Sequence, residues 1–230
     1  MRKRSKRYRA SGDEKELRAA HGVGAAVERL LRMPNVKFDE TVELSFHLDV
    51  DPKQGDQMVR GIARLPHGNG KTLRVVAFTG SPEVALEAGA THAGLNDLIV
   101  QIEGGWCDFD VAVATTAAMK EVRSVAKILG PKGLMPSPKS GTVGDDIVSI
   151  IREVLAGRCE FKMDKTANVA IAVGKRSFTK EALEANISAA LAALAQARPS
   201  AAKGVFVKSA ALSATMSPSV ALEVRALFAA

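Results

Sequence analysis

The sequence predicts an α/β protein in which a parallel α/β domain is inserted into an α+β outer domain built from both ends of the chain. Two hydrophobic patterns and the distribution of charge support this prediction. Strands of alternating polarity occur in both terminal segments, whereas the middle holds short continuous apolar runs. Residues 1–67 and 160–230 each carry a net charge of +4, and residues 68–159 carry −1. A chain of 230 residues accommodates two domains of ordinary size.

The first segment of the outer domain is predicted to hold one helix and two strands. Apolar residues recur at helical spacing over 23–31, and Pro34 ends the pattern. Residues 41–48 alternate strictly between polar and apolar side chains, as in a strand with one solvated face. A second strand is expected over 59–65, where Pro66 stops it.

The middle of the chain is predicted to form the parallel sheet. Residues 73–78 and 111–114 are short, nearly continuous apolar runs with helical stretches between and after them, which is typical of strands buried on both faces. The clearest helix begins at Ile147, because its apolar residues form one stripe and two acids, Asp145 and Asp146, precede it. Gly157 suits its C-terminal end.

The last part of the chain again alternates between polar and apolar residues, as the first segment does. Alternation over 159–163 and 169–173 predicts two strands, a helix should follow from about Thr179, and residues 205–209 are strand-like. The resulting boundaries are 1–67 for the first segment of the outer domain, 68–157 for the inserted domain and 158–230 for the second outer segment.

The sequence argues against membrane, secreted and mitochondrial classes. No run approaches the roughly 18 apolar residues of a membrane span. The N-terminal cations are followed by the charged residues 13–16 in place of the apolar core of a signal peptide, and these acids also disfavour a mitochondrial presequence. Cys107 and Cys159 lack metal-type spacing and are interpreted as reduced intracellular thiols, although a disulfide between them stays open.

No pattern of an enzyme is found, so we predict no catalytic residues, metal or cofactor. The histidines, at 21, 47, 67 and 92, have no ligand spacing. Residues 68–72 superficially resemble a P-loop, but Leu65 stands where its first glycine is needed. Val27 likewise replaces the third glycine of a dinucleotide fingerprint that would begin at Gly22.

The N-terminus is a basic arm, with six positive charges before the first acid. Such a density of charge favours nucleic acid, because every phosphate it neutralises releases counterions. The cations proposed to contact RNA are Arg4, Lys6, Arg7 and Arg9. A solvated tail remains the alternative.

Residues 130–143 contain three glycines, three prolines and two lysines. Glycine permits unusual turns and proline restricts them, so we expect a stiff basic loop that faces phosphates, or a simple connector. Gly130–Gly133 matches the four-residue KH loop, but the surrounding elements do not follow the KH order. A helix before the loop carries cations at i, i+3 and i+7. A secondary RNA contact would therefore use Lys120, Arg123, Lys127, Lys132 and Lys139, unless this is an ordinary solvated face.

Aromatic residues number only ten, which disfavours a stacking platform for unpaired bases. Recognition of a folded RNA through its backbone, ribose and shape fits the composition better. The rival from another class is a nucleotide- or cofactor-binding enzyme built on the inserted domain.

The segment 129–136, Leu-Gly-Pro-Lys-Gly-Leu-Met-Pro, resembles the signature of the L-one family of large-subunit ribosomal proteins, bacterial type. The similarity extends over nearly the whole chain in many ordered motifs. These lie at residues 6–9, 37–43, 56–61, 65–68, 164–165, 202–204 and 215–216.

The resemblance implies a Rossmann-like inserted domain between two hinge strands of the outer domain. It also implies a cytoplasmic, ribosome-bound protein, monomeric when free, that binds a folded region of large-subunit rRNA to form the mobile stalk. Further implied partners are the exit-site tRNA, whose release it assists, and its own mRNA, whose translation such proteins often repress.

Carried over by position, the resemblance implies an rRNA-binding surface in the outer domain. Phe38 and Met216 would contact ribose and base surfaces, although plain core packing is the alternative for both. The hydroxyls of Thr41, Ser209 and Thr215 would meet 2′-hydroxyl groups. Glu43 would accept from a ribose hydroxyl or orient its neighbours, and Lys37 and Lys165 would meet phosphates. The full set is Lys37, Phe38, Thr41, Glu43, Lys165, Thr166, Ser209, Thr215, Met216 and Ser217.

Three positions depart from the family pattern. Ser217 replaces a usual glycine, Met163 a common asparagine and Ala170 a frequent histidine. The contact geometry at these positions is therefore expected to differ from that of the family.

Overall fold

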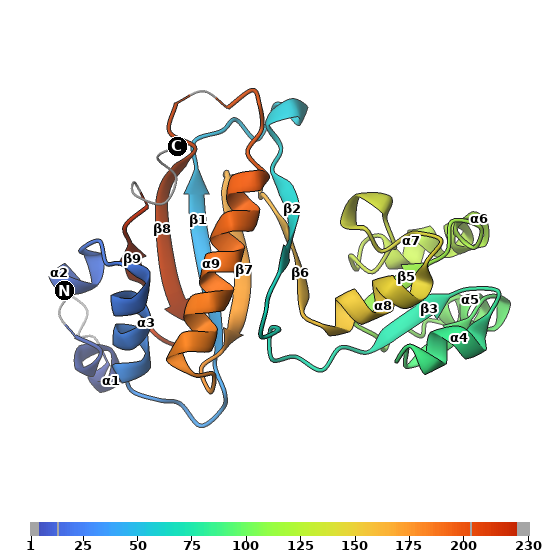
Figure 1. The fold of residues 1–230 in the computed structure, drawn as a ribbon, viewed down its shortest axis with the longest axis horizontal. Coiled ribbons are helices and arrows are strands. Elements are labelled where there is room, and N and C mark those ends of the chain that lie inside the picture. Colours follow the sequence, from blue (N-terminus) through green and yellow to red (C-terminus); the bar gives the residue numbers. More distant parts are fainter. Residues whose placement is uncertain (1–4, 13, 203, 225–230) are drawn as a thin grey trace. The chain divides into compact units, whose positions relative to one another are not determined.

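A computed structural model describes residues 5–12, 14–202 and 204–224, and it divides the chain into two compact units (Figure 1). Unit 1 comprises Met1–Gly70 and Gly157–Ala230, and unit 2 comprises Lys71–Ala156. Unit 1 contains antiparallel sheets and unit 2 a parallel one, so the predicted α/β class is confirmed. The chain passes from one unit to the other twice.

Unit 1 is built on a four-stranded antiparallel sheet of order β7-β1-β8-β9 and a two-stranded antiparallel sheet of β2 and β6. Its strands are β1 (Thr41–Leu48), β2 (Arg60–Arg64), β6 (Arg158–Lys162), β7 (Asn168–Lys175), β8 (Val207–Ala214) and β9 (Val220–Leu222). Its helices are α1 (Lys6–Ala10), α2 (Glu14–Arg18), α3 (Val23–Arg32), the short 3₁₀ turn η1 (Gly55–Gln57) and α9 (Lys180–Gln196).

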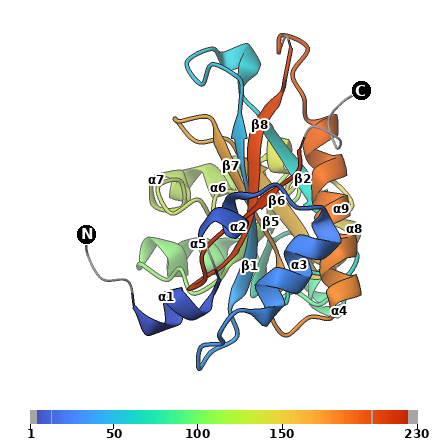
Figure 2. The same ribbon diagram turned by 90° about the vertical axis from the view of Figure 1, so that its left-hand side faces the viewer.

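The core of unit 1 lies between one face of the four-stranded sheet and the helices α3 and α9, which Figure 2 shows on the same side of the strands. Alternate residues of β1 are buried there, which confirms the predicted alternation. Helix α9 begins where the hydroxyl of Thr179 accepts the Ala182 N–H, a standard N-cap. Its buried stripe contains the four aligned residues of the prediction, Leu183, Ile187, Leu191 and Leu194.

Unit 2 is a three-stranded parallel sheet of order β4-β3-β5 with helices on both faces. Its strands are β3 (Val75–Phe78), β4 (His92–Gly94) and β5 (Val111–Ala114). Its helical segments are α4 (Pro82–Glu87), α5 (Asn96–Glu103), α6 (Met119–Val122), η2 (Arg123–Val125), α7 (Ala126–Leu129), η3 (Pro138–Ser140) and α8 (Ile147–Leu155). All four residues of β3 are buried, as the continuous apolar run predicted.

Helix α8 confirms the clearest prediction for the middle of the chain. The Asp146 side chain accepts the Ser149 N–H at 3.1 Å, so this acid is the N-cap. Ile147, Ile151 and Val154 are buried.

Several elements differ from the predictions. The expected single helix before residue 130 is divided into α6, the 3₁₀ turn η2 and α7. The last predicted strand begins at Val207 instead of residue 205 and continues to Ala214. The basic loop over 130–143 contains the 3₁₀ turn η3, which Gly141 ends in the left-handed conformation at φ 58°. The short strands β4 and β9 and the helix α1 had no separate signal in the sequence.

The segments that leave and re-enter unit 1 are held closely together within it. Asn186 of α9 is fully buried and donates to the Gly68 carbonyl at 2.9 Å and the Val173 carbonyl at 2.7 Å. Its own oxygen accepts the His67 N–H at 3.0 Å. Gly157 has φ +102°, and a Cβ placed there would lie 2.2 Å from the Gly68 Cα. Only glycine fits such an approach between two backbones.

We predict that Gly157→Ala lowers the free energy of unfolding of unit 1 by about 2 kcal/mol, because it adds both a backbone clash and left-handed strain. Gly55→Ala is the matched control, since a Cβ at Gly55 meets nothing within 4 Å. Urea denaturation followed by circular dichroism measures both variants. Equal stabilities for the two would refute the close approach.

Candidate nucleic-acid interface

The four-stranded sheet of unit 1 has a second face that the core helices do not cover. Every second residue of β1 points to it, and the register places partners from β7 and β8 on either side. We call this surface the open face. It consists of four rungs, which are Lys175–Thr41–Thr215, Ala172–Glu43–Ser213, Ala170–Ser45–Ala211 and Asn168–His47–Ser209.

The open face carries polar side chains at both ends and mostly small side chains between them. Its central rungs carry alanine and serine around the exposed side chain of Glu43, and none of these residues is buried. Rungs on one face of a strand are two residues apart, so the first and last rungs are separated by about 20 Å. The small side chains beside Glu43 allow a partner to approach the strands closely there.

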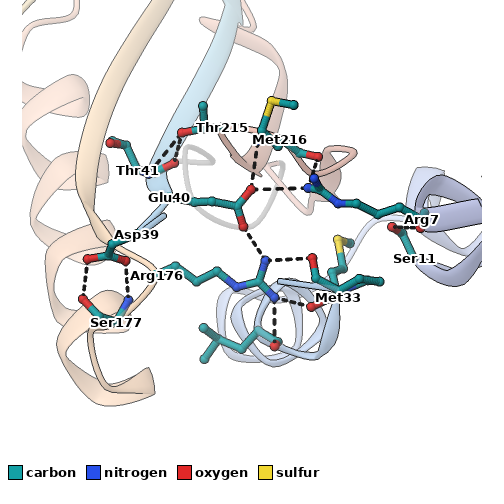
Figure 3. Close-up of polar contacts among 12 residues, drawn as sticks. Arg7, Ser11, Met33, Asp39, Glu40, Thr41, Arg176, Ser177, Thr215 and Met216 are labelled. Carbon is teal, nitrogen blue, oxygen red and sulfur yellow. Dashed lines mark hydrogen bonds and ion pairs between the residues drawn. The ribbon is translucent and has the colours of Figure 1, made fainter. Parts of the chain in front are cut away.

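The first rung is tied together by hydroxyl groups (Figure 3). The Thr215 hydroxyl accepts the Thr41 N–H at 3.1 Å and donates to the Thr41 carbonyl at 3.3 Å. Lys175 Nζ donates to the Thr41 hydroxyl at 2.9 Å. The Thr41 hydroxyl hydrogen is therefore left to donate outward, and one lone pair of the Thr215 oxygen remains.

Beneath this rung lies a buried ion pair, Glu40–Arg176 (Figure 3). Glu40 is fully buried and Arg176 is 9% exposed. Arg176 donates to Glu40 Oε2 at 2.6 Å and also to three carbonyl groups at the end of α3. These belong to Leu31 at 3.2 Å, Met33 and Pro34 at 3.5 Å.

The other carboxylate oxygen of Glu40 holds the turn after β8. Oε1 accepts the Met216 N–H at 3.0 Å and lies 3.5 Å from the Arg7 guanidinium, which also donates to the Met216 carbonyl. A buried carboxylate without such partners would be strongly unfavourable. The ion pair therefore joins α3, the start of β1 and the turn at Met216 in one fixed arrangement.

Two large apolar side chains project from this end of the sheet. Phe38 is 54% exposed and Met216 is 57% exposed, so the alternative of core packing is wrong for both. The segment that carries Phe38 is fixed by its neighbour Asp39, which accepts the Ser177 N–H at 3.1 Å and the Ser177 hydroxyl at 2.7 Å. Exposed apolar groups on a fixed backbone are typical of a binding surface.

The last rung borders a tight loop between β6 and β7. Asp164 accepts the Thr166 N–H and the Asn168 N–H, both at 2.8 Å, as well as the Thr166 hydroxyl. These hydrogen bonds, that from the Asn168 backbone foremost, hold the pKa of Asp164 below its ordinary value. The side-chain oxygen of Asn168 in turn accepts a hydrogen bond from His47 Nδ1 at 2.9 Å, so the imidazole position is also fixed.

The predicted rRNA-binding residues lie in two groups on this surface. Around the first rung are Lys37, Phe38, Thr41, Thr215, Met216 and Ser217, and beside the last rung are Lys165, Thr166 and Ser209. Glu43 lies on the second rung. The side chains of Lys37, Lys165, Thr166 and Ser209 are exposed.

The predicted basic residues elsewhere divide among four situations. Lys6 and Arg9 are exposed on α1, whereas Arg7 is partly buried against Glu40. Arg4 lies outside the described residues. In unit 2, Lys120, Arg123, Lys127, Lys132 and Lys139 are all exposed.

Several residues of the site, Glu40 among them, were not predicted from the sequence. Lys175, His47 and Asn168 stand on the polar rungs, and Arg176 supports the first of them. The only signal available was the position of His47 on the solvated side of the alternating strand.

The three departures from the family pattern have different surroundings. Met163 is 5% exposed and packs in the core of unit 1. Ala170 lies on the open face beside Ser45, where it leaves the centre low. Ser217 stands in the turn after Met216, and its hydroxyl oxygen is buried without a hydrogen-bond partner.

Other kinds of site find no support in the part of the chain that the structure describes. No group of three or more His, Cys, Asp or Glu side chains could hold a metal ion. No helix there is long and apolar enough to cross a membrane. Cys107 and Cys159 are both thiols that form no disulfide bond.

Comparison with known proteins identifies close relatives of the chain. The model of the Ribosomal protein L1p/L10e family matches residues 30–218. "Large ribosomal subunit protein uL1" of Protochlamydia amoebophila is 45% identical over 96% of this chain and 94% of its own. The proteins of the same name from Kosmotoga olearia and Chlamydia trachomatis serovar L2b are 44% and 43% identical, over 97% and 100% of both chains, respectively.

We predict that Glu40→Gln lowers the free energy of unfolding of unit 1 by about 3 kcal/mol, because it leaves the buried Arg176 charge without a counterion. Glu160→Gln is the control, since it removes a partly exposed ion pair with Arg60 and should cost less than about 1 kcal/mol. Chemical denaturation measures both. Similar losses of stability in the two variants would show that the buried Glu40–Arg176 pair contributes no more than a partly exposed ion pair.

The Asp164 loop makes a prediction about pH. A carboxyl whose pKa is lowered by folding stabilises the protein above its unfolded pKa, near 3.8, and this contribution is lost as the pH falls through the folded value. Asp164→Asn should therefore destabilise unit 1 more at pH 7 than at about pH 3. Urea denaturation of both proteins at the two pH values tests this, and a constant difference would contradict it.

Proposed function

Because the chain belongs to the Ribosomal protein L1p/L10e family, we propose that it is a structural protein of the large ribosomal subunit that binds rRNA through the open face of unit 1. Membership of this family of structural ribosomal proteins also means that the chain is not an enzyme. The observation that carries the proposal is the four-rung surface, with small side chains beside Glu43 in the middle and polar groups at both ends.

The shape of the open face suits folded RNA. The minor groove of an A-form helix is wide and shallow and displays 2′-hydroxyl groups, and proteins recognise it by shape and by ribose and phosphate contacts. Small side chains on the central rungs allow the RNA backbone to come close to the strands. Polar groups about 20 Å apart at the two ends of the sheet then fix its direction and register.

Each group of the first rung has a distinct role in this proposal. Thr41 donates its free hydroxyl hydrogen to a ribose oxygen, and the remaining lone pair of Thr215 accepts from a 2′-hydroxyl. Phe38 and Met216 cover the apolar surfaces of a ribose or an exposed base. Lys37 binds a phosphate beside them. The buried Glu40–Arg176 pair keeps these groups in place before RNA arrives, which lowers the ordering cost of binding.

At the other end, the Asp164 loop presents Lys165 and Thr166 to a second stretch of the RNA backbone. Ser209 and His47 lie on the adjacent rung and add a hydroxyl and an imidazole. Glu43, between the two ends, accepts from a ribose hydroxyl. The exposed cations Lys6 and Arg9 of α1 supply phosphate contacts that do not depend on sequence.

The finer roles in translation form a second part of the proposal. The exposed cations of unit 2, which run from α6 through α7 into the loop after Leu129, provide a surface for the backbone of exit-site tRNA. Assistance in the release of that tRNA follows if unit 1 is anchored on rRNA. A segment of the protein's own mRNA that resembles the rRNA site would compete for the open face, and translation of that mRNA would be repressed.

The rival hypothesis, a nucleotide-binding enzyme on unit 2, has less support. A dinucleotide site needs a glycine-rich turn after the first strand and a helix whose N-terminus faces the phosphates. Here β3 is followed by Thr79, Gly80, Ser81 and then a six-residue helix that begins with a proline. This turn lacks the required glycine spacing.

We predict that Phe38→Ala and Thr215→Ala each weaken binding to a folded large-subunit rRNA fragment by about 1–3 kcal/mol, because each removes a contact at the first-rung end of the open face. Val100→Ala is the control, since Val100 is an exposed apolar residue of unit 2. Titration calorimetry with the rRNA fragment measures the affinities.

Unchanged affinity in both interface variants would show that the RNA binds elsewhere. Tight binding of a common nucleotide together with no affinity for any structured rRNA would favour the rival hypothesis instead.

A further inference from the structure

We propose that Arg7 is a positioning residue for RNA recognition and acts differently from the other cations of the basic arm. By this proposal it clamps the Met216 turn in its binding conformation, whereas its neighbours on α1 attract phosphates. The inference rests on the proposed function of the open face, which it deepens by assigning a separate role to one residue.

The contacts of Arg7 distinguish it within α1. Its guanidinium donates to the Met216 carbonyl and lies 3.5 Å from Glu40 Oε1, so it bridges the turn and the buried ion pair (Figure 3). Its side chain is 30% exposed and that of Glu40 is fully buried. Lys6 and Arg9 are exposed on the same short helix. One cation of the arm is therefore directed inward.

Hydrogen bonds at both ends of α1 hold the helix in place for this contact of Arg7. The Ser5 hydroxyl accepts the Tyr8 N–H at 3.2 Å at its beginning. At its end the buried Ser11 donates from its hydroxyl to the Arg7 carbonyl at 3.1 Å. Both ends of α1 are thus capped by serine hydroxyls, which is the physical reason that a five-residue helix is stable here.

Arg7 completes the fixation of the peptide groups around Met216. The Met216 N–H donates to Glu40 Oε1 at 3.0 Å, and the Met216 carbonyl accepts from Arg7. The following amide, that of Ser217, donates to the Ala214 carbonyl at 3.0 Å. With its backbone held from both sides, Met216 keeps its side chain exposed beside Thr215, which is the orientation that recognition requires.

The charges around Glu40 explain why a second cation fits there. Arg176 supplies a charged donor to Oε2, and the Met216 N–H alone would leave Oε1 with a neutral donor only. A charged donor is stronger than a neutral one in a site of low polarity. Arg7 also covers Glu40 from the side of the N-terminal arm, so the carboxylate does not face an RNA phosphate directly.

The first test needs no RNA. Amide hydrogen exchange in the free full-length protein should become about tenfold faster at Met216 and Ser217 in Arg7→Ala, because one of the two clamps is lost. Arg9→Ala, on the same helix, should leave both rates unchanged. Arg7→Lys should restore most of the protection, since an ammonium group can still donate to the same oxygens.

The second test uses the RNA. Affinity is measured against salt concentration for a folded large-subunit rRNA fragment and for an unrelated RNA of equal length. Arg7→Ala should weaken binding to the rRNA fragment by about tenfold and leave the salt slope unchanged, because a positioning residue neutralises no phosphate. Arg9→Ala should weaken binding to both RNAs alike and reduce the slope of log affinity against log salt concentration by about 0.7–0.9.

The outcomes separate the two proposals. If wild-type protein does not prefer the rRNA fragment, the proposed function fails, whatever the exchange data show. If wild type prefers it but Arg7→Ala behaves like Arg9→Ala in both tests, Arg7 is an ordinary phosphate contact and the inference is overturned. Circular dichroism melting of each variant shows whether unit 1 is still folded. If Arg7→Ala is not folded, Arg7→Lys is used for both tests.

Discussion

The buried pair of Glu40 and Arg176 is the interaction on which the rest of the candidate interface depends. Neither charge is tolerable in the core of unit 1 without the other, and each uses its remaining hydrogen-bonding capacity on a different part of the chain. Arg176 donates hydrogen bonds to carbonyl groups at the end of α3, and Glu40 accepts one from the turn that carries Met216. A single ion pair thereby connects the packing of the core helices to the geometry of the surface that meets RNA.

The open face combines two demands that usually conflict, close approach and specific contact. Alanine and serine surround Glu43 on its central rungs, and hydroxyl, amide and imidazole groups stand at its ends, where they are held by their own hydrogen bonds. Because hydrogen-bonded groups stand at the ends of the face, the fold tolerates the exposed side chains of Phe38 and Met216 there. Their backbones are fixed by the Asp39–Ser177 and Glu40–Met216 contacts, so the side chains need no packing partner in the free protein.

Much of the fold follows from local patterns. Alternation along 41–48 and 169–173 predicts strands with one solvated face, and the acid-capped apolar stripe at Ile147 predicts α8. The break of the helix at η2 and the helix α1 have no such signal, because they depend on tertiary packing and on two serine caps. Glu40 and Arg176 stand 136 residues apart, so nothing in either local sequence indicates that they meet. The place of Lys175 opposite Thr41 likewise depends on strand register, which includes a bulge after Val42.

The central claim is that one RNA lies along the open face and contacts both of its ends. Amide hydrogen exchange of the full-length protein, measured with and without a folded large-subunit rRNA fragment, tests it most directly. We expect protection at 37–41, 164–168 and 209–217 at the same RNA concentration, with no change in α9 on the opposite side of the sheet. Protection confined to unit 2, or appearing at only one end of the sheet, would contradict it.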